Sequence, residues 1–215
     1  MIRSALSALF CLVCLMQNAV AGTYEDAVVA TIENRPEVLS AALSAGLDPN
    51  TITPSGAGDP LLMLAVRNSA DKIIDLLLEH NQIRIDTPNQ VSETPLMLAV
   101  YTKQNAIADK LLAHGASVNN RNHWTALHYA ASVSNHEMVV KLIEHGADVN
   151  ARTVRGITPL YMAARDADYE TVRILLDAGA RRDFCTNDAY APYDIAKQRR
   201  NTDSVINALK YDHCR

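Results

Sequence analysis

Two pairs of cysteines have spacings that could support chemistry. Cys11 and Cys14 form the CxxC pattern that is typical of redox and metal sites. They lie, however, within the uncharged, largely apolar run from Ala5 to Met16, which is typical of a secretory signal peptide. We therefore expect these two thiols to be removed together with that segment.

Residues 1–21 as a whole have the organisation of such a signal peptide. Arg3 supplies the positive charge at the start, and Ala19–Ala21 forms a small-x-small cleavage site. Cleavage is predicted before Gly22, which would place the mature chain in the bacterial periplasm or, alternatively, outside the cell. The apolar run is shorter than the roughly 20 residues that cross a bilayer, so we expect no membrane insertion after cleavage. An uncut signal that acts as a membrane anchor is the alternative.

Cys185 and Cys214 are the pair that stays once residues 1–21 are removed. Two remaining cysteines in an exported chain indicate one disulfide. It would close a loop of about thirty residues at the C-terminal end and contribute about 3–4 kcal/mol by chain-entropy arguments. A reactive pair of thiols is the alternative interpretation.

Histidines are the other residues that could ligate a metal. His80, His114 and His145 recur at nearly regular intervals, close to the expected ends of helices. Neighbouring helices lie roughly 10 Å apart, whereas two ligands of one zinc ion each lie about 2.1 Å from it. At a helix C-terminus a histidine instead complements the helix dipole. We therefore predict no metal site.

No catalytic motif stands out. The sequence contains no HExxH, GxSxG or phosphate-binding-loop pattern. Gly56 and Gly58 begin like a GxGxxG pattern, but Leu61 occupies the third glycine position, so a turn is the better interpretation. We predict that the protein is not an enzyme and needs no cofactor.

Composition restricts the remaining classes. Of the 215 residues, 48% are hydrophobic and 20% are charged, which excludes an intrinsically disordered chain. The formal net charge is −4, so no basic field covers the whole molecule. A nucleic-acid partner is therefore disfavoured.

The elements that would position functional residues repeat along the chain. TPLMLAV starts at Thr94, TALHYAA at Thr125 and TPLYMAA at Thr158, while HGASVN starts at His114 and HGADVN at His145. Each Thr could cap a helix, a following Pro suits a first helical turn, and the Gly could end a second helix in the left-handed conformation. A period near 33 residues indicates stacked helical units.

These in-phase motifs resemble the ankyrin repeat family. The resemblance covers nearly all of the chain after residue 21 and implies an all-α solenoid of helix-turn-helix units joined by hairpin-like fingers. His128 would then bond a neighbouring Thr and a loop backbone rather than a ligand. We expect about six units, with boundaries near 22–55, 56–88, 89–119, 120–152, 153–185 and 186–215.

The resemblance also implies a binding surface, because ankyrin arrays typically bind other proteins through finger tips and first helices on their concave side. Matched onto this sequence, those positions predict as partner-binding residues Arg67, Glu93, Tyr101, Arg121, Trp124, Val133, Arg155, Ile157 and Arg165. Trp, Tyr and Arg are enriched at interface hot spots, and the arginines would favour a partner with an acidic patch. The alternative is that Trp124 packs against a neighbouring finger and that the arginines are merely solvated.

We therefore expect a non-catalytic interaction module, monomeric on its own, that binds a folded partner protein in the periplasm and stabilises, protects or inhibits it. Protection of a resident enzyme and neutralisation of a toxin, as by an immunity protein, are both open. A secreted effector that binds a host protein is a further alternative. Fold-level analogy does not separate these roles.

Overall fold

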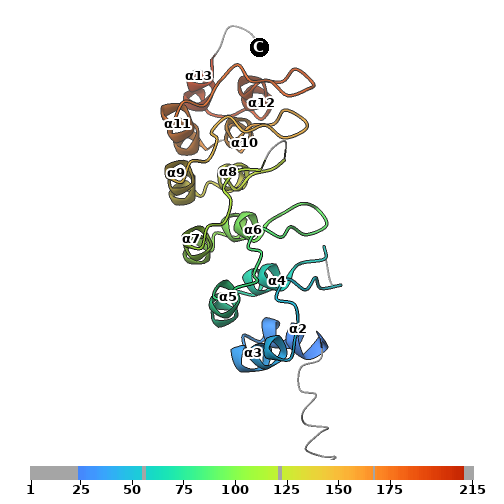
Figure 1. The fold of residues 1–215 in the computed structure, drawn as a ribbon. Coiled ribbons are helices and arrows are strands. Elements are labelled where there is room, and N and C mark those ends of the chain that lie inside the picture. The colour runs from blue at the N-terminus through green and yellow to red at the C-terminus, as the bar shows by residue number, and fades with distance from the viewer. Residues whose placement is uncertain (1–23, 55–56, 121–122, 167, 211–215) are drawn as a thin grey trace, which may run out of the picture. The chain divides into compact units, whose positions relative to one another are not determined.

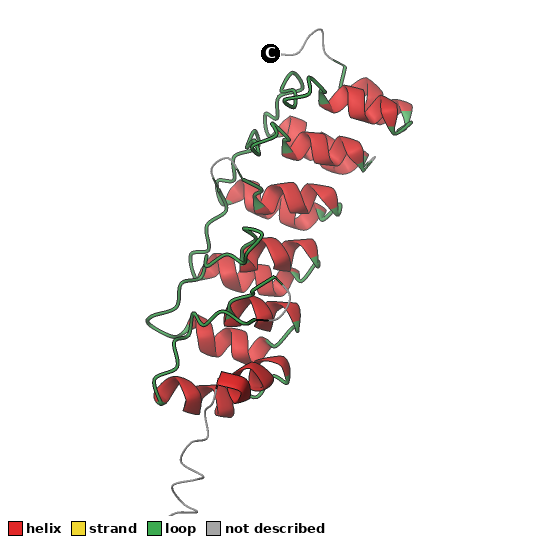
Figure 2. Cartoon of the chain, turned by 90° about the vertical axis from the view of Figure 1, so that its right-hand side faces the viewer, coloured by secondary structure: helices red, strands yellow, loops and turns green. Residues whose placement is uncertain are grey.

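The computed structural model describes residues 24–54, 57–120, 123–166 and 168–210. The regular secondary structure of these residues is helical apart from one isolated bridge, and loops connect the helices (Figure 2). The chain divides into two compact units, residues 1–84 and residues 85–215, hereafter unit 1 and unit 2. In both units the helices form antiparallel pairs. Each of the six predicted repeats contains one such pair.

Unit 1 contains two helix pairs, α2 (Tyr24–Ile32) with α3 (Pro36–Ser44) and α4 (Leu61–Arg67) with α5 (Asp71–Leu78). The first helices α2 and α4 pack together, and so do the second helices α3 and α5. The residues from Leu61 to Val66 are all buried. An isolated bridge between Ile52 and Pro60 closes the loop before α4.

Unit 2 contains four further pairs, in which first and second helices form two separate rows (Figure 1). The first helices α6, α8, α10 and α12 pack in succession, and α9, α11 and α13 do the same in the other row. Their bounds are α6 (Pro95–Tyr101), α7 (Asn105–Ala113), α8 (Ala126–Ser132), α9 (His136–Glu144), α10 (Pro159–Arg165), α11 (Tyr169–Asp177), α12 (Pro192–Gln198) and α13 (Asp203–Ala208).

The helix boundaries follow from local chemistry. Thr94 and Thr158 have extended backbones, and their hydroxyls accept hydrogen bonds from N–H groups in the first turn of α6 and α10. This satisfies donors that would otherwise be unpaired at a helix start. At the other end, Gly146 has a φ of +82°, a conformation that is costly for residues with a Cβ. The predicted capping roles of Thr94, Thr158 and Gly146 are therefore confirmed.

Small residues allow the first helices to approach one another. Ala99, Ala130, Ala163 and Ala196 occupy the same position of successive repeats, and each is fully buried. A larger side chain there would push neighbouring helices apart, because protein cores are close-packed. The regular spacing of these alanines therefore sets the packing of unit 2.

His128 is a structural residue inside this core. Its side chain is fully buried, its Nε2 lies 3.1 Å from the carbonyl oxygen of Ile157, and its Nδ1 lies 2.8 Å from the Thr125 hydroxyl. Because a carbonyl oxygen only accepts, Nε2 carries the proton and Nδ1 accepts from Thr125. Burial lowers the pKa of His128 to about 4. The ring therefore links one repeat to the next as a neutral imidazole, as the resemblance implies.

Candidate interaction surface

An aromatic cluster, formed by Tyr101, Trp124 and Tyr129, lies where α6 and α8 meet. Tyr101 ends α6 and Tyr129 lies within α8, so the packing of these helices brings the rings together. The ring centroids of Tyr101 and Tyr129 are 5.7 Å apart, and those of Trp124 and Tyr129 are 6.0 Å apart. Tyr101 is 53% exposed, whereas the other two rings are half-buried. The rings thus form one continuous surface that solvent can reach.

Trp124 packs on residues of its own repeat, whereas the alternative predicted that it packs against a neighbouring finger. Its ring contacts His128 edge to face, with the centroids 5.4 Å apart. Aromatic pairs prefer this geometry. Trp124 therefore packs on its own repeat through one part of the ring, and its remaining exposed part is available for a partner.

Glu93 extends this cluster with a negative charge. Its Oε1 accepts a 2.9 Å hydrogen bond from the Tyr129 hydroxyl, and its Oε2 accepts one of 3.1 Å from the Asn89 side-chain amide. Burial, and then the Glu93 carboxylate, raise the pKa of Tyr129 above its usual range, so the phenol keeps its proton. Sequence reasoning named Glu93 but missed Tyr129, although Tyr129 follows the repeat's His directly.

Asn89 fixes the finger that carries Glu93. The backbone N–H of Asn89 donates to the Glu93 carbonyl oxygen, and its buried side-chain oxygen accepts from the N–H groups of Val91 and Glu93. Equivalent backbone bonds close the fingers 153–157 and 186–190. The predicted hairpin-like fingers are therefore present, and the 89–93 finger holds its carboxylate in one place.

Apolar side chains stand exposed on the fingers. Val91 and Val154 lie within closed fingers, Tyr190 closes the finger 186–190, and all three are exposed. Ile157 and Val133, which the sequence also placed on this surface, are half-buried, and the backbone of Ile157 serves His128. The exposed apolar area of this surface therefore comes from the fingers more than from Ile157 and Val133, where the sequence predicted it.

The predicted arginines are less available than the sequence suggested. Arg165 makes two hydrogen bonds to the carboxylate of Asp166, at 3.1 and 2.8 Å, and these bonds raise its pKa. Arg155 lies 3.7 Å from Asp188 on the next finger, although both remain largely exposed. Neighbouring acids therefore offset much of the expected positive charge.

Tyr161 lies near the charges of Arg155, Arg165 and also Arg199, which sequence reasoning missed. Partial burial raises the pKa of Tyr161, while the three arginines act in the opposite direction. Arg199 follows α12 at the position that Asp166 occupies after α10, so the repeat period could have found it. Three arginines thus lie near one aromatic ring at this end of unit 2.

Two predicted residues are not among the described residues of unit 2. Arg67 belongs to unit 1, where its Nε donates a 2.7 Å hydrogen bond to the buried carboxylate of Asp59. Arg121 lies outside the described residues. The surface that the structure brings together therefore comes from unit 2 alone.

The histidines that could have ligated a metal make local hydrogen bonds instead. The Nδ1 atoms of His114 and His145 lie 2.8 and 2.7 Å from the carbonyl oxygens of Lys110 and Lys141 in the last helical turn. Within the part of the chain that the structure describes, no three His, Cys, Asp or Glu residues are grouped to hold a metal ion. Over the same residues, no helix has the length and apolar character needed to cross a membrane.

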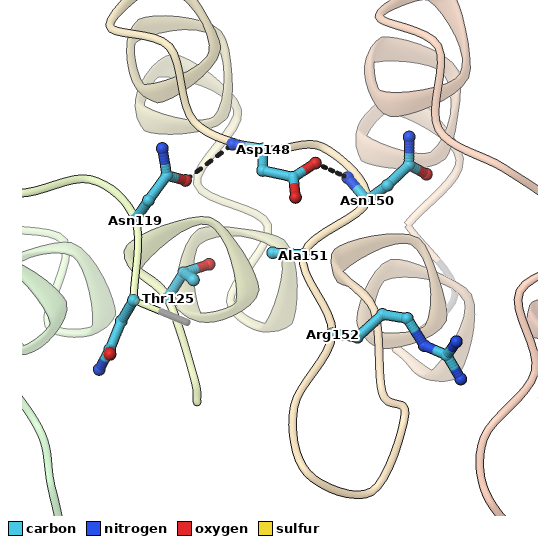
Figure 3. Close-up of a pocket in the computed structure, with 7 residues that line it drawn as sticks. Asn119, Thr125, Asp148, Asn150, Ala151 and Arg152 are labelled. Carbon is cyan, nitrogen blue, oxygen red and sulfur yellow. Dashed lines mark hydrogen bonds between the residues drawn. The ribbon is translucent and has the colours of Figure 1, made fainter. Parts of the chain in front are cut away.

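A polar hollow of about 690 Å³ lies between two successive repeats (Figure 3). Asn119 accepts from the Asp148 N–H, and the Asp148 carboxylate accepts from the Asn150 N–H, as the dashed lines show (Figure 3). Asn119 also donates to the Gly146 carbonyl oxygen. The side chains of Asn119 and Asp148 therefore hold the loops around this hollow in place, which indicates a structural role for both residues.

Cys185 is buried next to the finger 186–190. Its predicted partner, Cys214, lies outside the described residues, as do residues 1–21 with Cys11 and Cys14. The disulfide and the cleaved signal peptide therefore stay predictions.

Comparison with known proteins agrees with this architecture. A family model described as ankyrin repeats (three copies) matches residues 27–122 and 115–188. No curated protein sequence matches the chain.

Proposed function

Because this chain belongs to the ankyrin repeat family, whose repeats are generic protein-interaction modules, we propose that it binds a folded protein through the first helices and fingers of unit 2. The contact would centre on the aromatic cluster and extend over the finger tips. The module would perform no chemistry of its own and would act by holding its partner.

The observation that carries this proposal is the exposed aromatic cluster. Exposed aromatic rings that touch one another are costly in water, whereas Tyr and Trp dominate the energetics of protein interfaces. Tyr101 is more than half exposed, although it ends a helix whose other residues are all buried. A partner that covers the cluster would remove this apolar area from water.

The basic end of the surface supports a second contact. The charges of Arg155, Arg165 and Arg199 act on Tyr161, and an acidic segment of the partner would gain association rate from their field. Asp166 and Asp188 reduce that field. The acidic patch of the partner would therefore contribute mainly to orientation.

The place of action is proposed from the sequence. The signal-like residues 1–21 favour the periplasm, where the bound partner would be stabilised, protected or inhibited. An immunity protein that neutralises a toxin would use the same surface, and so would a secreted effector that binds a host protein. Fractionation of the producing cells separates the effector from the other two, because an effector leaves the cell.

The test is a pull-down from the native periplasm with the exported protein and with the double variant Tyr101→Ala, Trp124→Ala. We expect one stoichiometric partner that the double variant loses. The matched control is Val140→Ala, Tyr169→Ala, because these side chains are also exposed but lie on the second helices α9 and α11. A partner that both double variants retain equally would contradict the proposed surface.

A further inference from the structure

We propose that the Glu93 carboxylate and the aromatic cluster form a binding site for a cationic side chain, a lysine or an arginine, of the partner protein. The inference rests on the proposed function, because it names the chemistry that the same surface recognises. The arginines of this surface predict an acidic patch on the partner. The Glu93 site adds a positively charged side chain to the features expected of that partner.

The first argument is charge. Both oxygens of the half-buried Glu93 carboxylate accept hydrogen bonds from neutral donors, the Tyr129 hydroxyl and the Asn89 amide. Among the described residues, no Lys, Arg or His forms an ion pair with Glu93. A carboxylate that is partly removed from water attracts a cation more strongly than an exposed one.

The second argument is the position of the rings. A cation is attracted to an aromatic face within about 6 Å of the ring centroid. Tyr129 lies 5.7 Å from Tyr101 and 6.0 Å from Trp124, centroid to centroid, and its hydroxyl touches Glu93. A cation held by the Glu93 carboxylate would therefore lie beside the Tyr129 ring, which Tyr101 and Trp124 both contact.

The third argument is that the site is already built. Asn89 is buried and closes the finger, so the Glu93 backbone is held before any partner arrives. Arg165, the nearby cation of α10, is engaged with Asp166. A pre-organised site binds without the cost of ordering a loop.

Trp124 is the only tryptophan of the chain, so its fluorescence and its indole N–H resonance report on this site directly. The probe is tetramethylammonium chloride, titrated against the purified protein, with tert-butanol as a neutral molecule of similar shape and sodium chloride as the ionic-strength control. We expect a saturable change in the Trp124 signal with tetramethylammonium and none with the two controls.

Two variants make the test specific. Glu93→Gln keeps the shape and the acceptor for Tyr129 but removes the charge, and should weaken tetramethylammonium binding about fivefold. Glu144→Gln removes an exposed carboxylate from α9 and should leave binding unchanged. No saturable change, an equal response to tert-butanol, or an unchanged response of Glu93→Gln would overturn the cation site.

The pull-down distinguishes this failure from failure of the proposed function. If the partner is lost with Tyr101→Ala, Trp124→Ala but held undiminished by Glu93→Gln, the interaction surface stands and the cation site is wrong. If the double variant keeps the partner, the proposed surface itself is wrong, whatever the tetramethylammonium titration shows.

Discussion

The hydroxyl of Tyr129 donates a 2.9 Å hydrogen bond to Glu93, which lies 36 residues earlier in the chain. The bond joins the first helix of one repeat to the finger of the repeat before it. It also fixes the ring and the carboxylate relative to each other. The geometry of the candidate binding surface therefore depends on a contact between repeats, and each repeat supplies only part of it.

Replacing Tyr129 by Phe tests that contact. The change removes only the hydroxyl, so Glu93 keeps Asn89 as a donor and the aromatic packing stays. We expect the free energy of unfolding to fall by about 1 kcal/mol, measured by urea denaturation. Tyr169→Phe on α11 is the control and should change it by less than about 0.5 kcal/mol, because that ring is on the exposed surface. Equal effects of the two changes would mean that the bond adds no net stability.

Sequence reasoning succeeded where the determining contacts are local. Thr94 and Thr158 cap the helices that directly follow them, and Gly146 ends α9 one residue after its C-cap. Burial of the repeated alanines follows from the period alone. The helix pairs and the fingers could therefore be predicted before the structure was known.

The charges of the surface were harder to predict, because they depend on pairs of repeats. Asp188 lies 33 residues after Arg155, at the equivalent position of the next finger, and the two face each other. Tyr129 and Glu93 likewise meet only when the units stack. Comparing each charged residue with the one a period later would have revealed the first pair. The second depends on side-chain directions that no spacing gives.

Replacing Gly146 and Gly156 by Ala distinguishes the free-energy cost of a positive φ from the cost of a steric clash. Gly146 and Gly156 have similar positive φ angles, +82° and +75°, but a Cβ at Gly146 would meet nothing within 4 Å. A Cβ at Gly156 would lie 2.9 Å from the Arg152 guanidinium and 3.1 Å from the carbonyl oxygen of Cys185. We expect Gly146→Ala to cost about 1 kcal/mol of folding free energy, and Gly156→Ala to cost about 1 kcal/mol more. Thermal or urea unfolding of the two variants side by side measures the difference, and equal losses would show that Arg152 and the other atoms around Gly156 move to accommodate the methyl group.

Asn119 offers a test of the bonds that connect successive repeats at their second helices. Asn119→Ala leaves the Asp148 N–H and the Gly146 carbonyl oxygen without their partner. We expect a loss of about 1 kcal/mol, since water replaces part of these bonds at this exposed position. Asn119→Asp should lose less, because Asp86 accepts from the Ser117 N–H in the same way one repeat earlier. If the Asp variant were the less stable of the two, repulsion from Asp148 would outweigh the retained bond.

The predicted disulfide between Cys185 and Cys214 can be checked by mass. The exported protein should be lighter than its reduced form by two hydrogen atoms, and the same spectrum shows whether the chain begins at Gly22. Reduction should lower the free energy of unfolding by about 3–4 kcal/mol. The double variant Cys185→Ser, Cys214→Ser should not respond to a reductant. Two titratable thiols in the unreduced, denatured protein would contradict the disulfide.

His128 should make the fold sensitive to acid. Its pKa is about 4 in the folded protein, against an ordinary value of 6.5, so between these values the unfolded chain takes up a proton that the folded chain refuses. The contribution of the neutral ring is therefore complete above about pH 6.5 and is lost as the pH falls toward 4. The full loss is about 3 kcal/mol at 1.36 kcal/mol per pKa unit.

Urea denaturation between pH 7.5 and pH 4 measures this loss, with His128→Met as the comparison. Met97 occupies the same position one repeat earlier, and its sulfur lies 3.5 Å from the Thr94 backbone nitrogen, which donates to it. The variant should be less stable at pH 7.5, because the Ile157 carbonyl oxygen loses one of its two donors and keeps only the Thr153 backbone N–H. Its stability should then change less with pH than that of the unchanged protein. His123→Gln, at an exposed histidine outside this core, is the matched control. If His128→Met retained the whole acid sensitivity, a group other than His128 would have to cause it.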